Sequence, residues 1–357
     1  MNFWHGYMIK LQLFRKQIHR KVLALLLRLL VCIITVTSCS EEIDLYSESD
    51  KLTAIYCLLN NNDSVQYLRI SSQYTIIGNG KVIKPDSIDL TVKGDFIAYL
   101  SQTSRSGEQV SHHFTPSFSI KKDTGWFPTE ALQVYETRCT ITPNTIYSLY
   151  VLFPKEKRMI FAKTVSFGGG VHVFDPAMVP GRKLNLFPGE DFYLRYEPLK
   201  NAAIYQATAK FLYDDIRDGI AERKELVLTL PLKFDDQTDI DFISQRISGD
   251  RFLRDVAREI AMDTSVKRRP VGFNFHISVG GEELALEIKK DLDAASFSSA
   301  DYSSFKNAAG IFSSLSHKWI ETIPLSKFTI DSLALSSLTR GLGFLTYDEI
   351  NKLDSIK

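Results

Sequence analysis

The sequence is poor in the residue types that hold metals and close disulfides. Its 357 residues include only seven histidines and four cysteines. No two histidines stand at the spacing that would place a pair of metal ligands on one face of a helix. His172, His276 and His317 stand alone, and the adjacent His112 and His113 would point to opposite faces of a strand. We therefore expect no metal site.

The sequence also lacks a strong charge bias. Lys and Arg total 43, Asp and Glu total 42, and the two signs are interspersed. Proteins that bind a phosphate backbone concentrate Lys and Arg on one surface, so this balance argues against such a partner. We therefore expect that the protein binds no nucleic acid.

A catalytic motif is missing too. No serine lies in a glycine-flanked turn that would expose a nucleophile, and no cysteine has a histidine pattern to activate it. Gly168-Gly169-Gly170 is followed by Val171 to Pro176, which is not a helix pattern, so we interpret it as a hinge rather than a phosphate cradle. The carboxylate pair of a hydrolase has no sequence spacing to recognise, which keeps a hydrolase as an alternative. The leading expectation is a protein that is not an enzyme and needs no cofactor.

The most apolar run is too short to span a membrane. Val22 to Val36 is interrupted by Arg28, whereas a spanning helix needs about 20 apolar residues. A basic head precedes this run, and Val36-Thr37-Ser38-Cys39 ends it. The pattern predicts a cleaved lipoprotein signal peptide over residues 1–39, with the lipid carried by the thiol of Cys39. The alternative is an ordinary signal with an incidental cysteine.

The predicted mature chain suits two domains of ordinary size. Loss of the six basic residues of the signal leaves 37 Lys and Arg against 42 Asp and Glu, a net charge of −5. Residues 40–50 are acidic and polar, and we expect a tether beside the lipid. This segment resembles the acidic export signal of surface lipoproteins in the Bacteroidota; the alternative is a merely solvated linker.

Cys57 and Cys139 are the two cysteines that remain after the predicted cleavage, and both lie in strand-like runs. In an oxidising compartment they can form a disulfide, which would stabilise the fold by roughly 4 kcal/mol because it closes a long loop. Two separate buried thiols are equally consistent with the sequence.

A strand pattern dominates the first half of the mature chain. Residues 51–167 alternate between apolar and polar side chains, as in Ser87–Lys93 and Thr145–Phe153, with turn residues between the runs. They predict an N-terminal β-sandwich, followed by a linker over residues 168–190.

The second half mixes strand and helix patterns. Alternation predicts strands at 191–197, 201–213, 225–234, 272–279 and 284–288, the last two joined by a turn at Gly280-Gly281. Apolar residues at three- and four-residue spacing predict a helix over Asp250–Met262, after a shorter helical turn from Asp239 to Ile247. These patterns predict a second β-sandwich over residues 191–335 with a helical insert near 239–262.

The last residues, 336–357, predict a tail with a short helix, because Thr346 and Glu349 have the spacing of a capping box. The expected fold is therefore mainly β. It consists of two antiparallel β-sandwich domains of the immunoglobulin or fibronectin type, the second carrying one or two α-helices.

Two turns in the predicted sandwiches resemble each other. Asn144 and Asn201 each precede an Ile-Tyr pair and an alternating strand, with Tyr147 and Tyr205 as the tyrosines. The corner tyrosine of fibronectin-like sandwiches has a similar place, so the two turns indicate a weak internal repeat. Chance similarity is the alternative.

Gly125-Trp126-Phe127-Pro128 is the best candidate for recognition. A turn that carries adjacent Trp126 and Phe127 exposes at least one ring to solvent or to a neighbouring loop, and exposed aromatic residues often anchor contacts. The alternative is that both rings close the end of a sandwich. Lys267-Arg268-Arg269 could contact an anion, but such a run is more typical of a solvated helix end.

Five stretches in this order resemble a family of Bacteroidota outer-membrane lipoproteins of unknown function, numbered four-two-four-nine among such domains. They are the signal ending in Cys39, Asn62–Ile70, Gly125–Pro128, the strand around Tyr147, and Asn307–Phe312. The last stretch departs from the family pattern, because Ala308-Ala309-Gly310 stands where members usually have Gly-Leu-Gly or a similar run.

The resemblance implies a lipoprotein exposed at the surface of the outer membrane. Members are often encoded beside TonB-dependent receptors, which suggests a surface subunit that helps such a receptor capture or admit a ligand. This link is associational, and it assigns no catalytic residue. A structural or adhesive surface lipoprotein without a transport role, and a hydrolase, are the alternatives.

Overall fold

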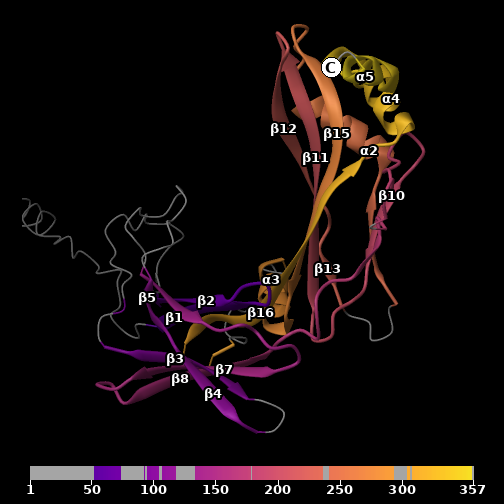
Figure 1. Cartoon of the computed structure of the whole chain (residues 1–357). Helices are drawn as coiled ribbons and strands as arrows, with labels where there is room; N and C mark the ends of the chain where they lie inside the picture. Colours follow the sequence, from indigo (N-terminus) through magenta and orange to yellow (C-terminus); the bar gives the residue numbers. More distant parts are fainter. Residues whose placement is uncertain are drawn as a thin grey trace, which may run out of the picture. The chain divides into compact units, whose positions relative to one another are not determined.

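The computed structural model describes residues 52–73, 92, 95–103, 107–117, 133–177, 179–235, 241–292, 304–305 and 308–355. They belong to one compact unit made of residues 51–74 and 83–357. This part of the chain is mainly β, as the sequence predicts, and it forms several sheets (Figure 1). Some predicted features lie outside the described residues: the lipid site Cys39, the tether 40–50, nearly all of the strand Ser87–Lys93, and Trp126 and Phe127.

Four strands of the first half form an antiparallel sheet in the order β4-β3-β7-β8. Their bounds are β3 (Ile97–Thr103), β4 (Gln109–His113), β7 (Ile146–Phe153) and β8 (Arg158–Val165). The strand predicted at Thr145–Phe153 is therefore confirmed. Its alternate residues Tyr147, Leu149, Val151 and Phe153 are all buried, because successive side chains of a strand point to opposite faces.

A larger sheet of nine strands has the order β12-β11-β15-β16-β1-β2-β6-β5, with β13 beside β11. Its strands are β1 (Leu52–Asn60), β2 (Val65–Gln73), β5 (Thr115–Ser117), β6 (Val134–Arg138), β11 (Ile204–Arg217), β12 (Ile220–Thr229), β13 (Lys233–Phe234), β15 (Lys267–Gly280) and β16 (Ala309–Pro324). The strands predicted at 201–213 and 272–279 are confirmed, whereas the one predicted at 225–234 is divided between β12 and β13.

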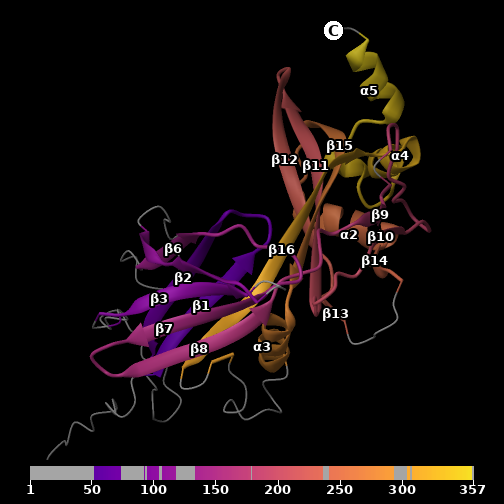
Figure 2. The ribbon, with the colours of Figure 1, turned by 60° about the horizontal axis from the view of Figure 1, so that its bottom comes forward.

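β16 pairs with both the beginning and the later part of the chain (Figures 1 and 2). Its first residues pair in parallel with β1, starting at Ala54 opposite Ala309. Its later residues pair antiparallel with β15, starting at Gly280 opposite Leu315. The nine-stranded sheet is therefore continuous only because this one strand joins its two parts.

A three-stranded sheet in the order β14-β10-β9 completes the described strands. Its members are β9 (Val173–Asp175), β10 (Phe192–Tyr196), which confirms a predicted strand, and β14 (Ile243–Ile247). One hydrophobic core joins this sheet to β11, β15 and the helices α2 (Gly249–Glu259), α4 (Lys327–Leu335) and α5 (Tyr347–Asp354), with the 3-10 turn η1 (Arg340–Leu342). None of the described helices has the length and apolarity that a membrane crossing requires.

The helices agree only in part with the sequence. α2 confirms the helix predicted at Asp250–Met262 and begins after the N-cap Ser248. α5 confirms the predicted capping box, in which Thr346 and Glu349 each bond the other's backbone N–H. The described residues nevertheless contain four α-helices, where one or two were expected in the second sandwich and one in the tail.

The strand predicted at 284–288 is wrong, because these residues lie in α3 (Glu282–Leu292). Two acidic residues in the first turn and two basic residues in the last turn complement the helix dipole. Gly280 ends β15, and Gly281 accepts the backbone hydrogen bond of Ala285, so the glycine pair starts a helix instead of closing a hairpin. The charged residues at the two ends of α3 thus favour a helix more strongly than the short alternation of Leu284, Leu286 and Ile288 favours a strand.

The helical turn predicted from Asp239 to Ile247 is also wrong. Its described part contains β14, which pairs antiparallel with β10. Ile243, Gln245 and Ile247 are buried on one face, which is the period of a strand. The segment 168–190, expected as a linker, contains β9 and supplies the core residues Leu184 and Leu186.

The two similar turns share their local backbone and contact each other. Asn144 and Asn201 both have positive φ, 52° and 69°, a conformation that asparagine adopts more readily than most residues. The side-chain amide of Asn201 donates to the backbone carbonyl of Ser166 at 2.9 Å. The backbone N–H of Gly168 donates to the carbonyl of Lys200 at 3.2 Å. The repeated turns thus form one junction.

Each turn is followed by a buried tyrosine that bonds back to it. The hydroxyl of Tyr147 accepts the backbone N–H of Thr142 at 2.8 Å, and the hydroxyl of Tyr205 accepts that of Leu199 at 2.8 Å. Burial raises the pKa of Tyr205 to about 12, so its hydroxyl stays neutral. The hydrogen bonds give the resemblance between the two sequences a physical basis.

We expect Tyr205→Phe to lower the free energy of unfolding by about 1–3 kcal/mol, because it leaves the buried backbone N–H of Leu199 unpaired. Tyr147→Phe should lower it by less, because the backbone N–H of Thr142 is only part-buried. Urea unfolding of the purified chain measures the loss. Tyr196→Phe is the matched control, since the buried Tyr196 hydroxyl has no hydrogen-bond partner among the described residues. An equal loss in all three variants would show that ring packing, and not the hydrogen bond, is responsible.

Candidate functional site

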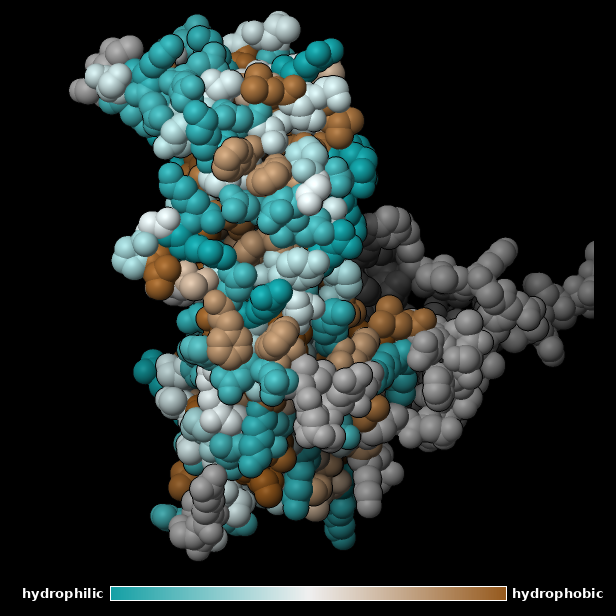
Figure 3. All heavy atoms as spheres, turned by 90° about the vertical axis from the view of Figure 1, so that its right-hand side faces the viewer, coloured by the Kyte–Doolittle hydropathy of each residue, from teal (hydrophilic) through white to brown (hydrophobic). Residues whose placement is uncertain are grey.

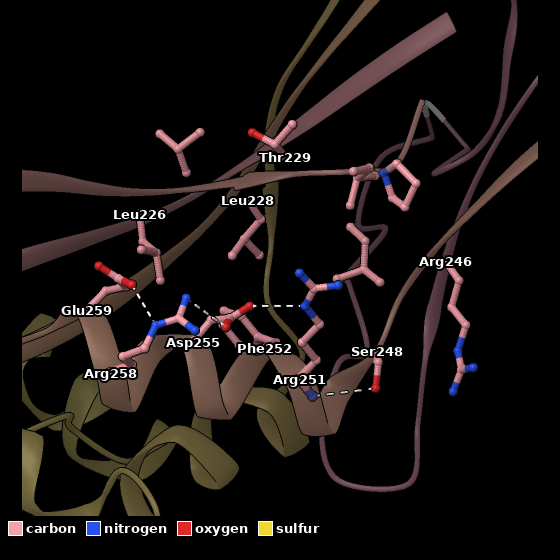
Figure 4. Close-up of a pocket in the computed structure, with 14 residues that line it drawn as sticks. Leu226, Leu228, Thr229, Arg246, Ser248, Arg251, Phe252, Asp255, Arg258 and Glu259 are labelled. Carbon is pink, nitrogen blue, oxygen red and sulfur yellow. Dashed lines mark hydrogen bonds and ion pairs between the residues drawn. The ribbon is translucent and has the colours of Figure 1, made fainter. Parts of the chain in front are cut away.

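A groove lies between the edge strand β12 and helix α2 (Figure 4). Its volume of about 600 Å³ is within the range of ligand sites. β12 pairs with β11 on one side, and no strand of the described residues pairs with its other side. The backbone N–H and C=O groups of such an edge can pair with another extended chain.

The floor of the groove is apolar. Leu226 and Leu228 point from β12 toward α2, where Phe252 is buried, while Thr229 points to the opposite side of the strand (Figure 4). Both leucines are half-buried and pack against the hydrophobic core. Strand alternation explains the arrangement, because every second residue of β12 faces α2. The groove therefore offers apolar contacts to a chain lying along β12.

Charged side chains of α2 line the rim. The carboxylate of Asp255 lies between Arg251 and Arg258, at N–O distances of 3.5 and 3.2 Å. Arg258 also pairs with Glu259 at 2.7 Å. The Asp255 side chain is only 15% exposed, but the two arginines are 70% and 71% exposed. Their outer N–H groups can therefore still bind a carboxylate of a ligand.

Arg246 lines the groove from β14 and is held in place by Asp191. Its Nε donates to Asp191 at 2.5 Å, and the other oxygen of this carboxylate accepts the backbone N–H of Gly249 at 3.2 Å. The hydrogen bond from Arg246 lowers the pKa of Asp191 below its usual value. The ionised carboxylate thus connects β14 to the positive end of α2.

The free strand edge, the apolar floor and the exposed arginines suit the binding of an extended chain. An extended chain paired with β12 would place alternate side chains over Leu226 and Leu228. Its acidic side chains would reach Arg251 and Arg258 on the rim. The groove lining contains no cysteine or histidine, and Ser248, its one serine, caps α2.

A polar cluster lies on the face of the same sheet turned away from α2. His276 and Ser278 of β15 face the same way, and Ser278 lies opposite His317 of β16. His276 Nε2 and His317 Nδ1 are 3.0 Å apart, and Ser278 Oγ lies 3.2 Å from the same nitrogen of His317. The ring of Trp319, opposite His276, stacks on that imidazole with centroids 3.8 Å apart.

The charge state of the two histidines follows from their surroundings. Partial burial lowers the pKa of His276, and the neighbouring His317 and Lys210 lower it further. Burial also lowers the pKa of His317, although Asp63 opposes this effect. Both imidazoles therefore favour the neutral form, and the hydrogen bond between their ring nitrogens requires that the accepting nitrogen be unprotonated.

Sequence reasoning treated His276 and His317 as isolated, because 41 residues separate them. The alternation of 272–279 places His276 on the polar face of a strand. The spacing of residues within one strand does not predict that β15 pairs with β16, which brings His317 beside it. Within the described residues, no group of three or more His, Cys, Asp or Glu could hold a metal ion.

The remaining predicted site residues are the lipidation site, the two aromatic residues and the two cysteines. Cys39, Trp126 and Phe127 lie outside the described residues. Cys57 and Cys139 are free thiols in the core of the first half, so the structure has the second of the two alternatives, separate buried cysteines. Burial raises the pKa of Cys139 to about 11 and also raises that of Cys57, so both stay protonated and unreactive.

Lys267-Arg268-Arg269, predicted as a solvated helix end, is instead the start of β15, and Arg268 is buried.

On the face shown in Figure 3, apolar residues lie in small separate groups among hydrophilic ones, which is ordinary for a protein surface. No protein-family model and no curated protein matches this chain.

Proposed function

We propose that this chain is a lipid-anchored binding protein of the cell envelope, whose groove beside β12 captures an extended, acidic segment of a partner protein. The partner that fits the sequence resemblance is a TonB-dependent outer-membrane receptor, and the role is that of an accessory subunit in ligand capture or uptake. The observation that carries the proposal is the unpaired edge of β12 above an apolar floor with an arginine-lined rim.

The occupant follows from the chemistry of the groove. A free strand edge selects an extended backbone, because only that conformation presents N–H and C=O groups at matching intervals. Leu226 and Leu228 select apolar side chains at alternate positions. The guanidinium groups of Arg251 and Arg258 are 70% and 71% exposed, whereas the Asp255 carboxylate between them is 15% exposed, so the outer rim presents N–H donors that favour acidic side chains.

The anchor and the finer fold belong to the same proposal. A lipid on Cys39 would hold the domains at the membrane and raise their effective concentration near a receptor. We also propose that each half is a β-sandwich of the immunoglobulin or fibronectin type. The back-bonding of Tyr147 and Tyr205 supports this, since such tyrosine corners accompany that architecture.

The test is purification of the tagged, lipidated chain from its own outer membrane in mild detergent, followed by mass spectrometry of the proteins that accompany it. We expect the double variant Arg251→Glu, Arg258→Glu to recover at least about tenfold less receptor, a change of about 1.4 kcal/mol in binding, because it repels an acidic segment. Arg254→Glu is the matched control, since this exposed arginine of α2 does not line the groove.

A chain recovered without any receptor, under conditions that preserve a known receptor complex, would contradict the transport role and favour adhesion. Equal loss of partner in the double variant and in the Arg254 control would contradict the groove as the binding site. A receptor that is recovered in full by the double variant would do the same.

A further inference from the structure

The face of the sheet turned away from the groove holds a pair of imidazole nitrogens that the proposed function does not use. His276 Nε2 and His317 Nδ1 lie 3.0 Å apart on adjacent strands of one sheet. Imidazole nitrogen is the commonest protein ligand for transition metals, and ligands on paired strands are held by the backbone ladder. We propose that His276 and His317 form a binding site for a divalent transition-metal ion, with Cu²⁺ bound most tightly.

The nitrogens of the metal-free pair are close enough for both to bind one ion, and the Irving–Williams order gives the preferred ion. With metal–nitrogen bonds of about 2.0–2.1 Å, nitrogens 3.0 Å apart subtend an angle of about 95° at the metal. Tetrahedral ligands would lie about 3.3 Å apart at the same bond length. An angle near 90° is that of neighbouring ligands in a square-planar or tetragonal ion, the geometry of Cu²⁺ and Ni²⁺. Cu²⁺ also binds nitrogen ligands most strongly in the Irving–Williams series.

The ion would take the place of the proton that the two imidazoles share. The ring that donates the shared hydrogen would carry it on its other nitrogen instead, so that His276 holds its hydrogen on Nδ1 and His317 on Nε2. Both rings then stay neutral, and the lone pairs of His276 Nε2 and His317 Nδ1 are free for the metal once the side chains rotate. Ser278 Oγ, 3.2 Å from the ligating nitrogen of His317, is placed to bond the ion or a water on it. Two protein nitrogens leave the remaining positions open to water or to an external ligand.

The surroundings fix the two rings and limit the positive charge near them. The flat ring of Trp319 stacks on His276 with an angle of 12° between the planes. The backbone N–H of His317 donates to the side chain of Asn62 at 2.6 Å. Lys210 lowers the pKa of His276, and its ammonium group is paired with Glu225 at 3.0 Å.

Trp319 provides a local readout, because bound Cu²⁺ quenches the fluorescence of an indole stacked on one of its ligands. In the full chain with Trp4→Phe and Trp126→Phe, Trp319 is the only tryptophan. We expect titration with copper sulfate to quench its emission in a saturable way at one equivalent. Ni²⁺ and Zn²⁺ should compete more weakly, in that order.

His276→Asn and His317→Asn should each raise the copper concentration for half-quenching by at least about tenfold. His172→Asn is the control, because this exposed imidazole contacts Glu197 in another part of the chain and should leave the titration unchanged. Circular dichroism of each variant checks that the sheet is retained. Unchanged quenching in either His276→Asn or His317→Asn would overturn the proposal.

Electron paramagnetic resonance gives a second, independent test that does not need the tryptophan. The Trp319→Phe chain with one equivalent of Cu²⁺ should give a tetragonal signal with coupling to imidazole nitrogen, and either asparagine variant should lose it. A signal that persists in both asparagine variants would place the copper elsewhere and overturn the site.

Discussion

Gly310→Ala is expected to lower the free energy of unfolding by more than about 4 kcal/mol, or to prevent folding altogether. Gly310 has a φ of 115°, which residues with a side chain rarely adopt. A Cβ at this position would lie 1.9 Å from the carbonyl oxygen of Ile55 in β1. Backbone cannot move aside as a flexible side chain can, so the parallel pairing of β1 with β16 would have to open.

Gly107→Ala is the matched control for this variant. Gly107 also has positive φ, 84°, but a Cβ there would meet no atom within 4 Å. It should therefore cost only the backbone strain of a left-handed residue, about 1–2 kcal/mol. Chemical unfolding of both chains measures the difference. If the two glycines cost the same, the close approach of β1 to β16 at Gly310 is wrong.

Asp215→Ala is expected to destabilise the chain by about 3–5 kcal/mol, because it leaves the charge of Arg268 buried and unpaired. The Arg268 side chain is 5% exposed and donates to Asp215 at 3.0 Å. The same guanidinium bonds the carbonyl of Leu342, and the Arg268 backbone bonds Gly343 and Leu345. Hydrogen exchange at residues 340–354 should rise together with the loss of stability, since Arg268 attaches this segment to β15.

Asp214→Ala tests whether burial is the cause. Asp214 precedes Asp215 on β11 and pairs with Arg223, whose side chain is 54% exposed. Solvent screens such a pair, so its loss should cost at most about 1 kcal/mol. The double variant Asp215→Leu, Arg268→Met should be closer to the wild type than Asp215→Ala, because it leaves no charge unpaired. Equal losses for Asp214→Ala and Asp215→Ala would contradict this account.

The same arginine shows how far local patterns could predict the structure. The composition of this run of three basic residues predicts a solvated end, whereas strand alternation places the middle residue inward and its neighbours outward. Composition is an average over a segment, whereas burial on a strand alternates residue by residue.

Element types were predicted well where the pattern was long, as in β7, β15 and α2, because many residues then agree on one period. α3 was missed because its three alternating leucine and isoleucine positions are too few to outweigh charged helix ends. The groove and the histidine pair could not be predicted. Both depend on which strands become neighbours, and strand pairing is decided by contacts far apart in sequence.

The shared strand β16 has a consequence for the order in which the protein can form. Ribosomes release a chain from its N-terminus, so β1 is made long before its partner at residues 309–315. Until then β1 can pair only with β2, and the backbone N–H and C=O groups on its other edge stay free to pair with a strand of another chain. The first half must therefore wait for the last quarter of the chain, and the interval before β16 arrives is when the polypeptide most needs protection from aggregation.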